Sequence, residues 1–166
     1  MQTAFIIIDV QNILVETGFE TQKLLEKISY LQDQARKQQI EIIYMQHIET
    51  PEALTSEDWQ LSPLLNRQEN EKVFQKRYNS MFKETGLKEY LDQQGIEKLV
   101  LCGMQTEYCV DTSVKVAFEH GYKLVVPEGT VTTFDGDDIP AETINDFYEN
   151  IWDERFADVL DYKTIF

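Results

Sequence analysis

The segment Thr3–Asp9 (TAFIIID) is an unbroken apolar run that ends in a carboxylate. A strand with one solvated face alternates apolar and polar residues, whereas a strand buried on both faces stays apolar along its length. The run therefore predicts a strand inside a sheet that is covered on both sides. Further strands are predicted at Ile40–Gln46, Glu71–Gln75, Lys98–Met104, Lys123–Pro127 and Phe156–Leu160.

Helical segments separate these strands. Within Gly18–Gln38, apolar residues recur at the three- and four-residue spacing of one helix face, and Thr21 is expected to cap its start. The apolar residues are Leu24, Leu25, Ile28, Leu31 and Ala35. Further helices are predicted at Gly86–Gln94, Thr106–His120 and Pro140–Asp153.

The ends of two of these helices, and one long connection, have their own signals. Gly121 is expected to follow the helix that ends at His120, as its left-handed C′ residue. Pro140 is expected in the first turn of the last helix. Ile48–Arg67 is rich in proline and acidic residues, which predicts a long loop with one helical turn.

Strands that alternate with helices predict parallel βαβ units with right-handed crossovers. We expect one domain over residues 1–166, with a Rossmann-like, three-layer α/β/α fold. Its sheet is expected to be mainly parallel, with about six strands in the order 3-2-1-4-5-6. Ligands of such sheets bind beyond the carboxyl ends of the strands, where the winding direction reverses.

Composition excludes several classes of partner. Thirty acidic and fifteen basic residues give a net charge of −15, which disfavours nucleic acid and anionic membranes. This charge does not by itself indicate a cationic substrate, because a solvated acidic surface explains it. The chain shows no apolar run of the roughly 20 residues of a membrane helix and no signal-peptide pattern. Two cysteines make no disulfide framework, so we expect a cytoplasmic enzyme with a small-molecule substrate.

Three residues at or beyond strand ends carry reactive groups. Asp9 ends the first strand, Lys76 follows the third, and Cys109 lies six residues after Gly103 near the end of the fourth. In the expected order, the first and fourth strands are neighbours at the switch point. Asp9 and Cys109 are then expected to face one crevice, and Lys76 to reach it from a loop.

Cys109 has the surroundings that a nucleophile needs. Its unperturbed pKa of about 8.5 leaves little thiolate at neutral pH. If Thr106 caps the helix, Cys109 lies near its positive end; Lys76 would also favour the thiolate, and Asp9 could accept the proton. Backbone N–H groups before the helix could bind an oxyanion. The alternative is an inert buried thiol, as expected for Cys102, with Asp9 only capping a turn.

Three segments of the chain resemble the isochorismatase-like cysteine hydrolases, a superfamily that contains nicotinamidases, N-carbamoylsarcosine amidases and isochorismatases. Residues 9–12 (DVQN) are similar to its D-x-Q-N opening, and residues 76–82 (KRYNSMF) to its K-x-x-x-S-x-F segment. Residues 103–110 (GMQTEYCV) are similar to its G-x-x-T-x-x-C-V signature. The resemblance extends from Phe5 to about Val159.

The resemblance implies a triad in which Asp9 is the base, Lys76 the electrostatic partner and Cys109 the nucleophile. It also implies attack on a carbonyl carbon, a thioester intermediate, release of ammonia or an amine, and hydrolysis by water. A cis peptide bond is expected between Met104 and Gln105, which would aim the N–H groups of Gln105 and Cys109 at the oxyanion. A homo-oligomer, dimer or tetramer, is expected on the same ground.

Departures from the family pattern narrow the expected chemistry. Nicotinamidases bind a metal through several histidines, whereas this chain has only His47 and His120, and Ser62 stands where the histidine after Trp59 would be. We therefore expect no metal and no other cofactor. Leu14 replaces an aromatic residue, which argues against a flat aromatic substrate. The candidate substrate-binding residues are Gln11, Leu14, Trp59, Tyr78, Phe82 and Tyr108.

Three hypotheses about function follow. The first is a metal-independent cysteine hydrolase that cleaves a small amide or a related C–N or acyl bond. The second is isochorismatase-type hydrolysis of a vinyl ether, with Asp9 as the acid; true isochorismatases typically lack the cysteine that this chain has at Cys109. The third is a non-catalytic family member that binds a small molecule or responds to oxidation of Cys109.

Overall fold

A computed structural model of residues 1–166 contains one seven-stranded sheet with the order β3-β2-β1-β4-β5-β7, in which β6 pairs with β4. Every pairing between these strands is parallel. The predicted order is confirmed, the sixth predicted strand being β7. The strands are β1 (Thr3–Ile8), β2 (Glu41–His47), β3 (Lys72–Lys76), β4 (Lys98–Met104), β5 (Lys123–Pro127), β6 (Val131–Thr132) and β7 (Asp158–Leu160).

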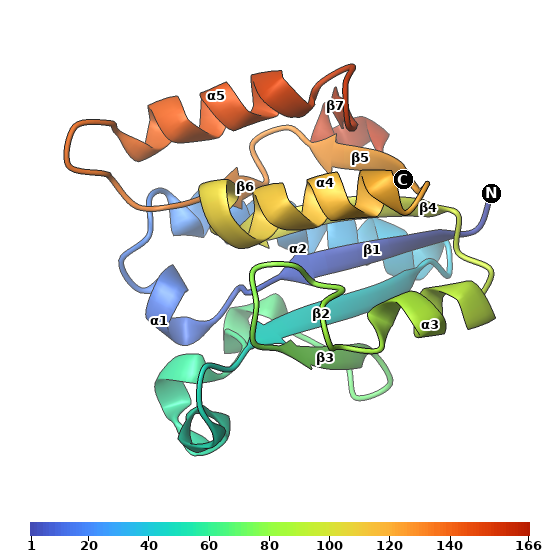
Figure 1. Cartoon of the computed structure of the whole chain (residues 1–166), viewed down its shortest axis with the longest axis horizontal. Coiled ribbons are helices and arrows are strands. Elements are labelled where there is room, and N and C mark those ends of the chain that lie inside the picture. The colour runs from blue at the N-terminus through green and yellow to red at the C-terminus, as the bar shows by residue number, and fades with distance from the viewer.

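Helices connect the strands and lie on both sides of the sheet (Figure 1). They are α1 (Asn12–Val15), α2 (Thr21–Lys37), α3 (Leu87–Gln93), α4 (Asp111–Glu119) and α5 (Ala141–Trp152). A π-helical turn, Thr106–Val110, precedes α4, and short 3₁₀ turns occur at Pro51–Thr55, Glu57–Trp59, Pro63–Leu65 and Tyr162–Thr164. None of the helices combines the length and hydrophobicity that crossing a membrane requires.

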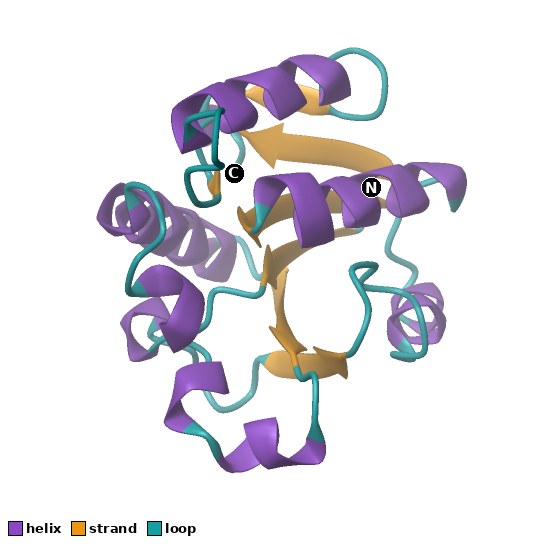
Figure 2. Ribbon diagram, turned by 60° about the vertical axis from the view of Figure 1, so that its left-hand side comes forward, coloured by secondary structure: helices purple, strands orange, loops and turns teal.

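The apolar run of β1 is buried because each of its faces meets a different helical layer (Figure 2). Phe5 and Ile7 pack with α2 and the C-terminal residues, while Ile6 and Ile8 pack with α3, α4 and the end of α5. Side chains of a strand alternate between faces, so both sets must be apolar. Full burial of one such isoleucine contributes about 1.5–3 kcal/mol.

Several local predictions need correction. Glu20 is the N-cap of α2, with φ of 47°, and Thr21 is its first helical residue. The Thr21 hydroxyl instead donates to the Val15 carbonyl at 2.7 Å, which ties α2 back to α1. Pro140 is the N-cap of α5 rather than part of its first turn. The long loop forms three 3₁₀ turns instead of one helical turn.

The helix predicted at Thr106–His120 also begins differently. Its first five residues form the π turn, whose N-cap is Gln105, and the regular helix starts at Asp111. The Thr106 hydroxyl donates to Asn145 Oδ1 of α5 at 2.6 Å, so Thr106 does not cap the helix. The other end is as predicted, because Gly121 follows the C-cap His120 with φ of +86°.

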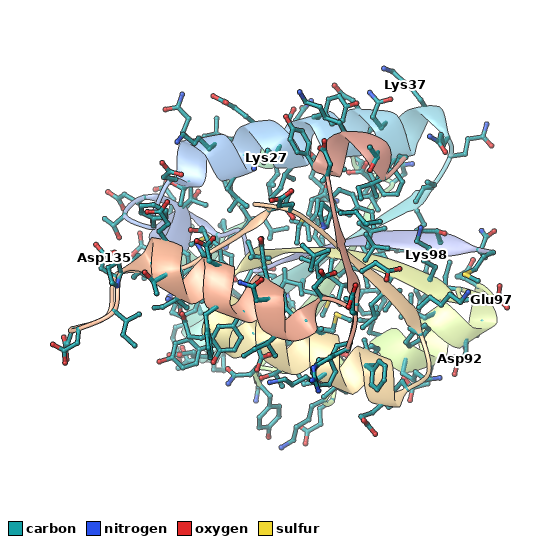
Figure 3. The ribbon with its side chains drawn as sticks, turned by 90° about the horizontal axis from the view of Figure 1, so that it is seen from above. Lys27, Lys37, Asp92, Glu97, Lys98 and Asp135 are labelled. Carbon is teal, nitrogen blue, oxygen red and sulfur yellow. The ribbon has the colours of Figure 1, made fainter.

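The carboxyl ends of the strands gather at one edge of the molecule, beside α1 and the 3₁₀ turns (Figure 1). The loop that leads into α5 extends past the same edge, where Asp135 lies far from Glu97 and Lys98 at the start of β4 (Figure 3). The connections at this edge can therefore supply side chains to a site.

Gly103 allows β1 and β4 to approach each other at this edge. It pairs with Ile8 and has φ of +125°. A Cβ at this position would lie 2.0 Å from the Ile8 carbonyl oxygen, which is backbone and cannot move aside. A side chain at residue 103 would therefore separate the two central strands.

We predict that Gly103→Ala lowers the free energy of unfolding by about 3 kcal/mol or more, because it adds a backbone clash to a strained φ. Gly86→Ala is the matched control, since Gly86 also has positive φ (+73°) but a Cβ added there would meet no atom within 4 Å. Gly86→Ala should lower the free energy of unfolding by only about 1 kcal/mol. Urea unfolding of both variants measures the difference, and equal losses would contradict the steric explanation.

Candidate active site

The ammonium of Lys76 lies at the centre of a buried polar cluster. Its Nζ is 2.7 Å from Asp9 Oδ2 and 3.1 Å from Cys109 Sγ. It is also 3.0 Å from the Tyr78 carbonyl oxygen and 3.2 Å from His47 Nδ1. The three residues of the expected triad therefore meet, although Lys76 is the last residue of β3 and not part of a loop.

Each of these side chains is placed by a strand end. Lys76 pairs with His47 at the ends of β3 and β2. Asp9 follows β1 in a left-handed conformation with φ of 50°, which aspartate tolerates better than most residues, and its N–H donates to the Met45 carbonyl at 3.1 Å. Cys109 lies in the π turn that follows β4.

Burial governs the protonation of Asp9. Its side chain is 1% exposed, and the ammonium of Lys76 is the cation paired with it. The Cys109 thiol also lies close to its carboxylate. Burial raises the pKa of Asp9, and the ammonium of Lys76 opposes that rise. A buried carboxylate without a cation is very costly, so Lys76 keeps Asp9 available as a charged group.

Burial also raises the pKa of the Cys109 thiol, to about 12, and the nearby charge of Asp9 adds to the rise while Lys76 opposes it. Burial thus favours the neutral thiol of Cys109, whereas the ammonium of Lys76 favours the thiolate. The raised pKa of Asp9 makes it a suitable acceptor for the thiol proton. Cys102, fully buried in β4, has its pKa raised well above normal by burial alone and packs in the core.

His47 also belongs to this cluster, although the sequence pattern did not single it out as a site residue. Burial and the charge of Lys76 lower the pKa of His47, so its ring is neutral. Its Nδ1 faces an ammonium, which can only donate; the lone pair therefore lies on Nδ1 and the proton on Nε2. The signal that could have identified His47 is its position at the carboxyl end of the second strand, equivalent to that of Lys76 on the third.

Asp9, His47 and Cys109 each offer a ligand atom, and these atoms lie within 4.8 Å of one another. Such a set could hold a metal ion. In this structure the ammonium of Lys76 contacts all three groups, so it already occupies the position between them. The positive charge at the centre of the cluster is thus supplied by the chain itself.

A pocket of about 260 Å³ opens above the cluster. This is smaller than the roughly 300–1,000 Å³ of sites for drug-sized ligands, so it suits a small molecule. It is lined by Asp9, Leu14, His47, Glu49, Trp59, Asn79, Gln105, Tyr108 and Cys109. Leu14, Trp59 and Tyr108 were expected there; Glu49 and Asn79 were not, because nothing in their spacing distinguishes them from loop residues.

The other three candidate substrate-binding residues lie elsewhere. Gln11 is buried and links the end of β2 to a later 3₁₀ turn, because its Nε2 donates to the carbonyls of His47 (2.9 Å) and Trp59 (2.6 Å). Tyr78 has an exposed ring under the ammonium of Lys83, 3.8 Å away, and contributes only its carbonyl to the cluster. Phe82 stacks on Tyr122 in the core.

The peptide bond between Met104 and Gln105 is cis, as the resemblance implied. The Gln105 carbonyl accepts hydrogen bonds from the N–H groups of Tyr108 (3.1 Å) and Val110 (3.2 Å), which fixes the π turn. The Gln105 N–H takes no part in a backbone hydrogen bond, and Gln105 lines the pocket. This N–H is therefore available to a ligand.

Comparison with known proteins gives concordant matches. A streptothricin hydrolase of Streptomyces noursei is 29% identical over 144 residues, 83% of this chain and 51% of that protein, so the chain spans about half of its length. A maleamate amidohydrolase of Pseudomonas putida is 37% identical over 59 residues, 36% of this chain and 28% of that protein. A solved isochorismatase family protein, 30% identical, has a TM-score of 0.91 over 96% of this chain and 98% of its own.

The family model described as the isochorismatase domain matches residues 3–163. That range includes all strands of the sheet and every residue that lines the pocket. The chain belongs to the isochorismatase family.

Proposed function

We propose that the protein is a metal-independent cysteine hydrolase that cleaves a small amide, or a related C–N or acyl bond. The contact of the Lys76 ammonium with both Asp9 and Cys109, at the floor of a small pocket, carries this proposal. Two relatives named as a streptothricin hydrolase and a maleamate amidohydrolase support hydrolysis as the reaction class.

The reaction begins with a proton transfer. Asp9 takes the proton of the Cys109 thiol, and the thiolate attacks the carbonyl carbon of the substrate. Burial makes both charged forms unfavourable alone, so the fixed ammonium of Lys76 is needed to stabilise whichever of the two carries the negative charge.

The tetrahedral intermediate needs hydrogen-bond donors for its oxyanion. The N–H of Gln105, which makes no backbone hydrogen bond, is one donor, and the N–H of Cys109 is the second. Collapse of the intermediate expels ammonia or an amine, which receives the proton from Asp9. A water activated by Asp9 then hydrolyses the thioester and returns Cys109 to the thiol.

We predict that Cys109→Ala lowers kcat/KM for a small amide by about 10⁴-fold or more, because the covalent route is removed. Intact mass of the wild-type protein during turnover should show an acyl adduct that maps to Cys109. Circular dichroism checks that the fold is retained. If the Cys109→Ala protein still hydrolyses isochorismate, ether cleavage by Asp9 is favoured instead. If the wild-type protein shows no turnover and Cys109 becomes oxidised, the non-catalytic alternative is favoured.

The pH profile tests the role of Asp9. Because burial raises its pKa, the carboxyl stays protonated, and inactive as a base, to a higher pH than an exposed aspartate. The acid limb of kcat/KM should therefore lie above the usual value of about 3.9. Lys76→Met removes the positive charge that the reaction needs and should abolish turnover across the pH range. For the wild-type protein, an acid limb in the ordinary range would rule out Asp9 as the base.

Chelation tests whether the reaction proceeds without a metal. Activity should survive exhaustive treatment with EDTA, and added Zn²⁺ should not increase it, because Lys76 occupies the position between the three donors. Loss on chelation, with recovery on adding metal back, would contradict the proposal.

A further inference from the structure

The pocket presents an unbalanced charge at its rim. Asp9 and Glu49 are the charged side chains that line it, and the charge of Asp9 is paired with Lys76 beneath it. No arginine lines the pocket, nor any lysine. The floor is therefore close to neutral, and the carboxylate of Glu49 is the charge that an entering molecule meets.

Glu49 has no cationic partner of its own. It forms no ion pair with a lysine or arginine, and its one polar neighbour is His47, whose Nε2 lies 3.8 Å from Glu49 Oε1. The side chain of Glu49 is 65% exposed, so it keeps room for a ligand. The ring of His47 is neutral and presents its Nε2–H toward this carboxylate, which leaves the negative charge of Glu49 uncompensated.

Basic residues nearby are engaged elsewhere. The ammonium of Lys83 lies over the ring of Tyr78, 3.8 Å from its centroid. Arg77 lines a different cavity, together with Glu84. Neither side chain lines the pocket above Cys109, so neither can pair there with an anionic substrate.

Two aromatic rings complete the rim. Trp59 and Tyr108 line the same pocket as Glu49, and the ring of Trp59 is packed beside His47 with centroids 6.0 Å apart. A carboxylate together with aromatic faces is the set of groups that binds ammonium ions, through charge and through cation–π attraction. The same groups disfavour a substrate that carries a carboxylate, because that carboxylate would be desolvated beside the like charge of Glu49.

We propose that Glu49 is a specificity-determining residue and that the pocket selects acyl substrates that carry a cationic group, such as a primary ammonium. This inference rests on the proposed function, because it concerns the substrate of the same site. The ammonium lies at the rim between Glu49 and the aromatic rings, while the carbonyl reaches Cys109 on the floor.

Three amides of matched length test the selectivity. δ-Aminovaleramide carries an ammonium, hexanamide a methyl group and adipic acid monoamide a carboxylate at the same position. We expect kcat/KM to fall in that order, with the cationic and anionic members about 10-fold or more apart, mainly through KM. A preference for adipic acid monoamide would overturn the inference while leaving the proposed hydrolysis intact.

Glu49→Gln should lower the preference for the cationic over the anionic amide by about fivefold. Glu52→Gln is the matched control, because it removes the same charge from the same loop at an exposed position that does not line the pocket. Equal effects of the two substitutions would assign the preference to the net charge of −15 and contradict a role for Glu49.

A second measurement does not depend on turnover. Aminoethyl and sulfonatoethyl methanethiosulfonate each transfer a thioalkyl group to a cysteine thiolate, forming a disulfide and releasing methanesulfinate. Reaction rates at Cys109 are followed by peptide mapping, and each is divided by the rate of the same reagent with β-mercaptoethanol. The normalised rate should be higher for the ammonium reagent than for the sulfonate reagent. Glu49→Gln should lower the ratio of these two rates, whereas Glu52→Gln should not. If no amide is hydrolysed but this pattern holds, the proposed function fails and the cation selectivity stands; a faster sulfonate reagent overturns the selectivity.

Discussion

The buried contact of the Lys76 ammonium with Asp9 is the interaction on which the site depends. An ion pair inside a protein gains little net stability, because removing both charges from water is expensive. Its value lies in what it imposes: with Lys76 fixed by its surroundings, the thiol of Cys109 and the carboxyl of Asp9 share one positive neighbour. When a proton moves from Cys109 to Asp9, the negative charge therefore stays beside the same ammonium.

The sheet order makes that contact available. β1 and β4 are neighbours, and β2 and β3 extend the sheet on the other side of β1, so Asp9, Lys76 and Cys109 reach one point from three separate segments. Gly103 brings the two central strands together, and the amide of Gln11 holds His47 and Trp59 in place. Function is therefore concentrated where the chain changes direction, while the body of the sheet provides rigidity.

The sequence predicted the main strands, their order and the convergence of the three reactive residues, because continuous burial and strand ends leave strong patterns. It did not predict β6, which has two residues, or the π turn, which is held by hydrogen bonds from Tyr108 and Val110 to the Gln105 carbonyl. His47 was missed because its contact with Lys76 joins residues distant in the chain, and Glu49 because nothing in its spacing distinguishes it from other loop residues. Phe82 was misplaced because an aromatic residue near a motif serves the core equally well.

Lys76 ends β3, and β3 is the outermost strand of the sheet, with mostly exposed residues. Its start is tied down by Glu71, which pairs with Arg36 and accepts the hydroxyl of Tyr44. Edge strands open locally at lower free energy than central ones. The ammonium of the site is therefore held by a border strand, so local opening of that strand would separate Lys76 from Asp9 and Cys109 without unfolding the core.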